Sequence, residues 1–78
     1  MKSGVIKYIN RAKGYGFIEP TESTSKQGKV FFHANDVVDP SYKELRINDK
    51  VDYIGVDTHA GLRALDVVAY QYIEAGGQ

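Results

Sequence analysis

KGYGFI at residues 13–18 and VFFH at residues 30–33 are the two runs that decide the fold of this chain. Each is rich in aromatic and β-branched residues, as short strands are. Successive side chains of a strand point to opposite faces, so Tyr15 and Phe17 share one face of the first strand. Ile18 lies on the other face and is the better core residue of the three. We therefore expect both rings to point outward.

The second run leaves two assignments, because either alternate pair of its side chains could be buried. Histidine is the least common core residue among the four, so we expect Phe31 and His33 to face outward. Pairing the two strands then gathers four flat rings on one face. A soluble protein rarely exposes such a patch without a use for it. Flat rings beside lysines suit stacking on unpaired bases next to phosphates.

The rest of the chain predicts three more strands. The five expected strands are residues 4–10, 15–19, 29–33, 50–56 and 63–73. Residues 21–28 are polar and predict a flexible loop, and residues 35–38 predict a short helical turn. The last segment could also form a helix, although its β-branched and aromatic residues disfavour this.

Five short strands without a clear amphipathic helix predict an all-β protein. A five-stranded antiparallel barrel of the OB type would close most of the strand edges. We expect one domain over residues 1–74 and a flexible C-terminal tail over residues 75–78.

The expected core is an apolar set that occupies alternate positions of these strands. It consists of Ile6, Ile18, Val30, Phe32, Val37, Val51, Tyr53 and Val67. Strict alternation would put Tyr8 on the same face as Ile6, and a bulge between them removes the conflict. Gly14 and Gly16 indicate a sharp bend or a close backbone approach beside the rings.

Composition bounds the class of protein. The chain has 78 residues, a formal net charge of zero and no cysteine, so neither a disulfide nor a zinc–thiolate site is expected. No segment has the roughly 20 apolar residues of a membrane span. The N-terminus also lacks the apolar run of a signal peptide. We expect a cytoplasmic protein with no membrane partner and no cofactor.

The charges are distributed unevenly. Residues 1–33 contain six Lys and Arg against two acidic residues, whereas residues 34–78 contain four against eight, so the halves carry +4 and −4. Small domains can show such asymmetry by chance. Here the basic half is also the half with the aromatic runs, which favours binding of a polyanion on that side.

Several segments of this chain together resemble the cold-shock domain family. The segments that carry the resemblance are GVIKYIN at 4–10, KGYGFI at 13–18, VFFH at 30–33, YKEL at 42–45 and DV at 66–67. It extends from about Lys2 to Val68, and the second and third segments match the two ribonucleoprotein motifs of the family. The resemblance implies a five-stranded OB barrel that binds single-stranded RNA and DNA. It also implies an ATP-independent RNA chaperone, with a role in cold or stress adaptation and in regulation of transcription or translation.

The resemblance also implies which residues contact nucleic acid. Base stacking would fall to Tyr8, Tyr15, Phe17, Phe31, His33 and Tyr42. Lys7 and Lys13 would flank the phosphates, and we expect Arg63 to add a contact from the last loop. Tyr42 has a second interpretation, in which it packs over the end of the barrel.

The chain departs from the family pattern at several positions. Tyr8 and Ile9 stand where Trp-Phe is usual, Ala34 replaces an aromatic residue, and Leu62 replaces a common proline. The loop over residues 19–29 is also longer than in the usual bacterial members. The smaller ring at Tyr8 and the methyl group at Ala34 reduce the expected stacking surface.

Other classes of function are weaker. A protein-interaction module could bind extended peptides on the aromatic face, as other small barrels do. An enzyme is the weakest alternative, because no nucleophile–base pair, paired carboxylates or phosphate-cradling loop is present. His33 and His59 alone, without cysteine, do not predict a metal site. We expect a monomer, with strand exchange into a domain-swapped dimer as the alternative.

Overall fold

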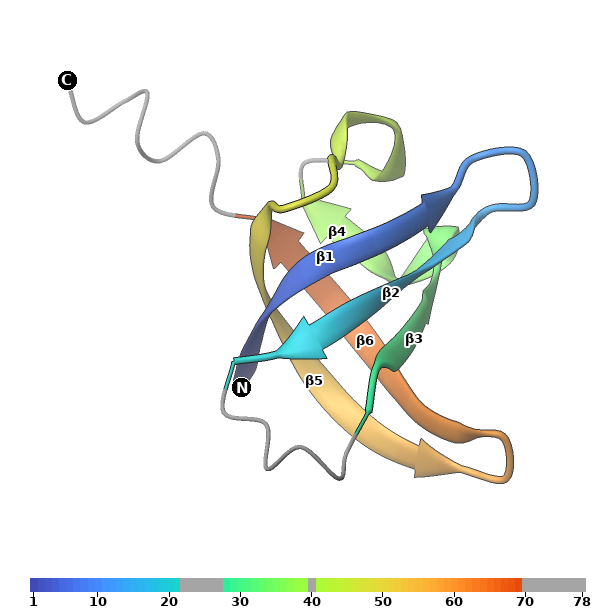
Figure 1. Cartoon of the computed structure of the whole chain (residues 1–78), viewed down its shortest axis with the longest axis vertical. Helices are drawn as coiled ribbons and strands as arrows, with labels where there is room; N and C mark the ends of the chain where they lie inside the picture. The colour runs from blue at the N-terminus through green and yellow to red at the C-terminus, as the bar shows by residue number, and fades with distance from the viewer. Residues whose placement is uncertain (22–27, 40, 70–78) are drawn as a thin grey trace, which may run out of the picture.

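The computed structural model describes residues 1–21, 28–39 and 41–69, and these residues form six strands and two single turns of 3-10 helix. The strands are β1 (Lys2–Asn10), β2 (Tyr15–Pro20), β3 (Val30–His33), β4 (Val37–Asp39), β5 (Lys50–Thr58) and β6 (Gly61–Ala69). The helical turns are η1 (Ala34–Asp36) and η2 (Tyr42–Glu44). Figure 1 shows the strands wrapped around a common interior.

The predicted all-β, five-stranded barrel is confirmed, and its five strands are β1, β2, β3, β5 and β6. The added strand, β4, has three residues and pairs only with β6 among the described strands. The helical turn expected at residues 35–38 forms at η1, one residue earlier. The last expected strand is a strand as far as Ala69. Its remaining residues, the tail at 75–78 and most of the 21–28 loop lie outside the described residues.

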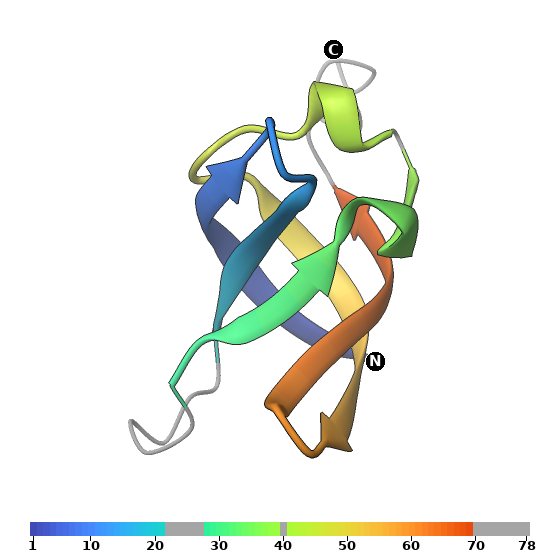
Figure 2. The same ribbon diagram turned by 90° about the vertical axis from the view of Figure 1, so that its right-hand side faces the viewer.

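The barrel closes through a parallel pairing. Its antiparallel pairs are β1–β2, β1–β5, β2–β3 and β5–β6, whereas β3 meets β6 in parallel at Phe31 and Arg63. Strands that alternate in direction around a ring of five must leave one neighbouring pair pointing the same way. Figure 2 shows β3 and β6 side by side at this closure. The predicted antiparallel barrel therefore contains one parallel seam, and β4 also pairs with β6 in parallel.

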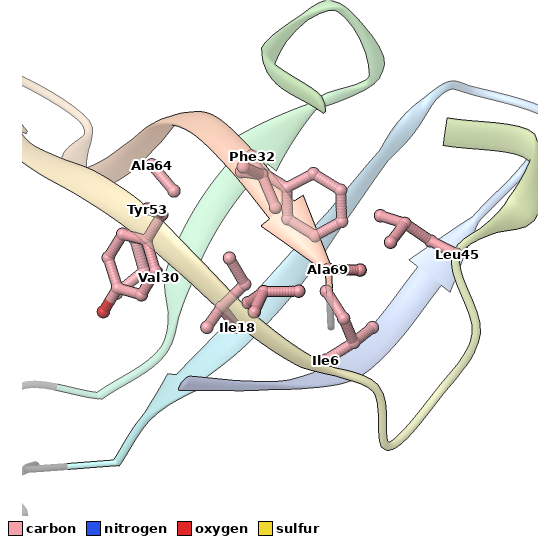
Figure 3. Close-up of a cluster of buried hydrophobic side chains, with 10 residues drawn as sticks. Ile6, Ile18, Val30, Phe32, Leu45, Tyr53, Ala64 and Ala69 are labelled. Atoms are coloured by element: carbon pink, nitrogen blue, oxygen red, sulfur yellow. The ribbon is translucent and has the colours of Figure 1, made fainter. Parts of the chain in front are cut away.

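The core agrees with the sequence prediction except at one position. Seven of the eight expected residues are no more than 2% exposed, whereas Val37 is half-buried and packs against the cluster from its edge. The structure adds Leu45, Ala64 and Ala69, all fully buried. Figure 3 shows Leu45 at one end of this cluster and Tyr53 at the other. Leu45 follows η2, so a segment outside the strands covers the end of the barrel.

The predicted bulge in β1 is confirmed. Ile6 pairs with Ile18, but the next pair is Tyr8 with Phe17, so the register shifts between Ile6 and Tyr8. Between these two pairs β1 contains one residue more than β2, and this extra residue is Lys7. The shift lets Ile6 point into the core while Tyr8 points outward.

The approach of β1 to β2 leaves no room for a side chain at Gly16. A Cβ atom at this position would lie 2.7 Å from Phe32 Cζ and in contact with the carbonyl oxygen of Tyr8. Real Cβ atoms do not approach other atoms this closely, so a larger residue would push β1 or Phe32 away. The glycine expected to mark a close backbone approach is therefore Gly16.

We expect Gly16→Ala to lower the free energy of unfolding by about 1–3 kcal/mol, because it overpacks this contact. Gly55→Ala is the matched control, since a Cβ atom there would come no closer than 3.5 Å to Lys2 Cδ. The control should change stability by less than about 0.5 kcal/mol. Urea unfolding of both variants measures the difference, and equal stabilities would contradict the steric account.

Tyr53 carries a buried polar group. Its side chain is 1% exposed, and its hydroxyl has no hydrogen-bond partner among the described residues. Burial raises the pKa of this phenol above its ordinary value of 10.0. An unpaired buried hydroxyl costs about 1–3 kcal/mol relative to one in water.

We expect Tyr53→Phe to raise the free energy of unfolding at neutral pH by about 1 kcal/mol, because it removes the unpaired hydroxyl. Since the raised pKa favours the neutral phenol in the folded state, ionisation of Tyr53 leaves stability unchanged well below pH 10.0 and lowers it as pH rises further. The variant should therefore lose less stability than the parent between neutral pH and pH 11, about one unit above that value. Thermal unfolding over this range tests both effects, and a destabilised variant would mean that the hydroxyl does have a partner.

Candidate nucleic-acid interface

Four rings on β1, β2 and β3 form one continuous surface, which we call the aromatic patch. It consists of Tyr8, Tyr15, Phe17 and Phe31. Neighbouring ring centroids lie 5.7–6.0 Å apart, and Tyr15 and Phe31 are stacked with an interplanar angle of 27°. Tyr8 is 43% exposed and the other rings are half-buried. The patch therefore presents aromatic surface to solvent while its members support one another.

Strand register brings these rings together. In the β2–β3 ladder Phe17 pairs with Phe31 and Tyr15 pairs with His33, so one face carries aromatic residues in two rows. Gly16 and Ile18 turn to the other face, where both are buried. The predicted placement of Tyr15, Phe17, Phe31 and His33 on a common face therefore agrees with the observed register.

His33 is fixed at the end of the patch by its neighbours in η1. Its Nδ1 accepts a hydrogen bond of 3.1 Å from the backbone N–H of Asn35, and its own backbone N–H donates to Asp36 Oδ2 at 2.9 Å. A neutral imidazole with Nδ1 as acceptor carries its proton on Nε2. His33 therefore offers a flat ring and one N–H donor. The next residue, Ala34, lies beside Gly14, so the patch ends there in a methyl group.

Asp36 is the buried charged residue next to this site. Only 9% of it is exposed, and Arg63 Nε and Nη2 donate to its two carboxylate oxygens at 3.1 and 3.2 Å. Paired bonds of this kind fix the plane of the guanidinium. Arg63, expected as the first residue of the last strand, lies within β6 and pairs with Phe31, so a contact from it would come from this strand and not from the last loop.

A pocket adjoins the aromatic patch where β6 meets it. It has a volume of about 350 Å³ and is lined by Phe17, Phe31, Thr58, Ala60, Leu62 and Arg63. Its lining therefore combines two rings of the patch with residues from the end of β5, the following turn and the start of β6. Leu62 also packs against the core, which fixes that part of the lining.

Tyr42 lies outside the aromatic patch. Its hydroxyl is within donating distance of the carbonyl oxygens of Asn10 (2.8 Å) and Tyr15 (3.1 Å), and its ring meets the edge of Phe32. Burial raises the pKa of this phenol, and the nearby Arg11 partly opposes the shift. The ring is half-buried and packs against the core, which agrees with the second interpretation of this residue.

Arg11 is a structural residue that the sequence did not reveal. Its guanidinium donates to the backbone carbonyls of Tyr42, Lys43 and Leu45, and lies 5.9 Å from the centre of the Tyr42 ring. The β1–β2 turn thereby holds η2 over the barrel end. An arginine in a polar turn looks like an ordinary surface residue in the sequence, because its partners are more than 30 positions away.

The two lysines next to the patch are exposed. Lys7 occupies the bulge of β1, and its Nζ lies 3.6 Å from Glu19 Oε1. Lys13 lies in the β1–β2 turn, where its backbone N–H donates to Asn10 Oδ1 at 3.0 Å. Glu19 therefore offsets part of the positive charge near Tyr8, whereas the Lys13 side chain extends from the turn that precedes Tyr15.

Neither a metal-binding cluster nor a membrane-spanning helix occurs in the described parts of the chain. No group of three His, Cys, Asp or Glu side chains comes together there as a metal ion would require. No helix within these residues has the length and apolar character needed to cross a membrane.

Comparison with known proteins establishes the family. The 'Cold-shock' DNA-binding domain matches residues 2–70, and the chain belongs to this family. The family binds nucleic acids and is not a family of enzymes. The resemblance inferred from the aromatic runs is therefore confirmed.

Relatives of similar length support the assignment. The chain is 37% identical over 67 residues to the major cold shock protein of Micrococcus luteus, which covers 86% of this chain and 96% of the relative. It is 32% identical to the major cold shock protein CspA of Pseudomonas aeruginosa, over 85% of this chain and 90% of the relative.

A solved structure shows the same fold. Drosophila Unr CSD456 aligns with a TM-score of 0.70 and 29% sequence identity. The alignment covers 87% of this chain but only 26% of that larger chain, so it compares the barrel and not the whole protein.

Proposed function

We propose that this protein binds single-stranded RNA and DNA on the aromatic patch and acts as an ATP-independent RNA chaperone. The observation that carries the proposal is the set of four ring centroids spaced by 5.7–6.0 Å on adjacent strands. Each ring can support one unpaired base, and such stacking tolerates any base because every base has a π-face. His33 extends the same surface by a further flat ring.

The mechanism follows from the arrangement of rings and charges. Bases turn toward the patch and stack on it, while the phosphates point outward to Lys7 and Lys13. In a duplex the faces of the bases are stacked on one another, so they are not available to stack on the patch. Tyr42, held at the barrel end, would contribute at most the exposed part of its ring.

Chaperone activity requires no energy source in this account. A protein that binds unpaired segments shifts the equilibrium of a hairpin toward its open form by mass action. Such a protein would act in the cytoplasm as a monomer, in cold or stress adaptation and in control of transcription or translation. Residues of the core would support the patch without contacting the strand.

Stacking should contribute more to affinity than charge does. Each stacked base is worth about 1–3 kcal/mol, whereas the formal charge of the whole chain is zero. Lys7 already has an acidic neighbour at 3.6 Å, which weakens its net attraction for phosphate. The salt dependence should therefore be shallow, at about −0.7 per neutralised phosphate.

The experiment that tests the proposal is a titration of intrinsic tyrosine fluorescence. Two of the four patch rings are tyrosines, and stacking on a base should quench their emission. We expect strong quenching by an oligothymidine heptamer and none by a duplex of equal length. If neither binds at micromolar protein, the proposal fails and the peptide-binding alternative becomes the better one. Equal binding of both would contradict the stacking mechanism.

Variants of the patch separate stacking from charge. Phe17→Ala and Phe31→Ala should each weaken binding of the heptamer by about 1–3 kcal/mol. Lys13→Ala should cost less, because one exposed charge contributes below about 1 kcal/mol.

Ile54→Ala is the control for these variants, since its side chain is 42% exposed on β5 and lies outside the patch. It should bind as the parent does. Thermal unfolding without nucleic acid checks that each variant is folded at the temperature of the titration. A lysine variant that binds more weakly than either phenylalanine variant would show that charge dominates.

A further inference from the structure

The pocket beside Phe17 and Phe31 has a feature that general stacking does not require. Its lining combines two aromatic rings with a charged side chain, Arg63, whose orientation is fixed. At about 350 Å³ the pocket is at the small end of ligand sites, which suits a single flat ring system. The question is what kind of base this arrangement would prefer.

Asp36 determines which donors of Arg63 remain available. A guanidinium has five N–H donors. The carboxylate accepts from Nε and from one hydrogen of Nη2, which lie along one edge of the planar group. Asp36 is the only partner of this guanidinium among the described residues. Three donors are left, and two of them, the other Nη2 hydrogen and the adjacent Nη1 hydrogen, point the same way as a two-pronged donor.

The same pair lowers the attraction for phosphate. Asp36 is nine-tenths buried and lies at hydrogen-bond distance from the guanidinium, so the two formal charges cancel. A neutralised pair attracts a polyanion weakly but keeps its N–H donors. Arg63 is therefore better suited to the edge of a base than to the backbone.

Barrel closure places this donor next to the rings. Arg63 pairs with Phe31 across the parallel seam between β3 and β6, which Figure 2 shows side by side. The side chain is 41% exposed, so it is accessible from the solvent side of the pocket. A base that stacks on Phe31 would have its edge near Arg63.

We infer that this pocket is a guanine-preferring subsite, in which Arg63 donates to O6 and N7 of the base and Asp36 positions Arg63. On the base edge that faces the major groove of a duplex, guanine is the base with two adjacent acceptors, O6 and N7. On that same edge adenine has a donor in place of one of them, and a pyrimidine offers a single acceptor or a donor. The inference deepens the proposed function and rests on it, because the base must first be single-stranded and stacked.

The test is a guanine scan of a single strand bound to the intact protein. A thymidine heptamer is compared with heptamers that carry one guanine at each position in turn. We expect one position to bind about fivefold or more tightly than thymidine, since a bidentate contact discriminates by about 1–3 kcal/mol. At that position inosine should retain the gain, because it keeps O6 and N7, whereas 7-deazaguanine should lose it.

Variants assign the preference to the residues. Arg63→Gln should bind the guanine-containing and the thymidine strands with equal affinity. The control is Arg46→Gln, which replaces an exposed arginine before β5 and should preserve the ratio of the two affinities. Asp36→Asn should reduce the ratio and steepen the salt dependence by about 0.7, because the arginine is then an uncompensated cation. A residue with only a structural role would not alter the salt slope.

The outcomes distinguish this inference from the proposed function. If every strand binds equally well, or if 7-deazaguanine binds like guanine, the guanine subsite is wrong while the stacking function stands. A preference that persists in Arg63→Gln would also overturn it. If no single strand binds, both fail together. Should Arg63→Gln not fold, the inosine and 7-deazaguanine strands decide the matter with the unmodified protein.

Discussion

The bulge at Lys7 lets β1 contribute one side chain to the core and another, two residues later, to the aromatic patch. With strict alternation these two side chains would point to the same face. Before the bulge, Ile6 completes the core opposite Ile18; after it, Tyr8 joins the aromatic patch opposite Phe17. Without the extra residue the side chain of Tyr8 would share the buried face of Ile6. The shift depends on a close approach of the two strands, which Gly16 allows because it has no side chain. The core and the patch are therefore two results of one local irregularity.

The parts of this molecule that could be predicted are those that depend on strand periodicity. Alternation in two short runs identified the outward rings, and the conflict between Ile6 and Tyr8 indicated the bulge. Five such runs predicted the barrel, and resemblance to a family then added the residues expected to contact nucleic acid. Val37 was misplaced because its strand, β4, has three residues and packs at the edge, where alternation no longer decides burial.

The parts that could not be predicted depend on contacts between distant segments. Leu45 belongs to no strand, so periodicity carries no information about its burial, and Arg11 holds the turn that precedes it over the barrel end. Asp36 and Arg63 are 27 positions apart, and nothing in either neighbourhood indicates the other. Such polar pairs are specified by the closed barrel, and the barrel must be known before they can be seen.

Parallel closure has a consequence for the binding surface as well as for the fold. An odd number of alternating strands must end in one parallel contact, and here that contact joins Phe31 to Arg63. The seam therefore brings a polar side chain of β6 to the edge of rings contributed by β2 and β3. Asp36, from the turn that follows β3, then fixes the orientation of Arg63 and neutralises its charge. A patch of rings alone would treat all bases alike, whereas a patch that ends at this seam acquires a directed pair of donors at one of its edges.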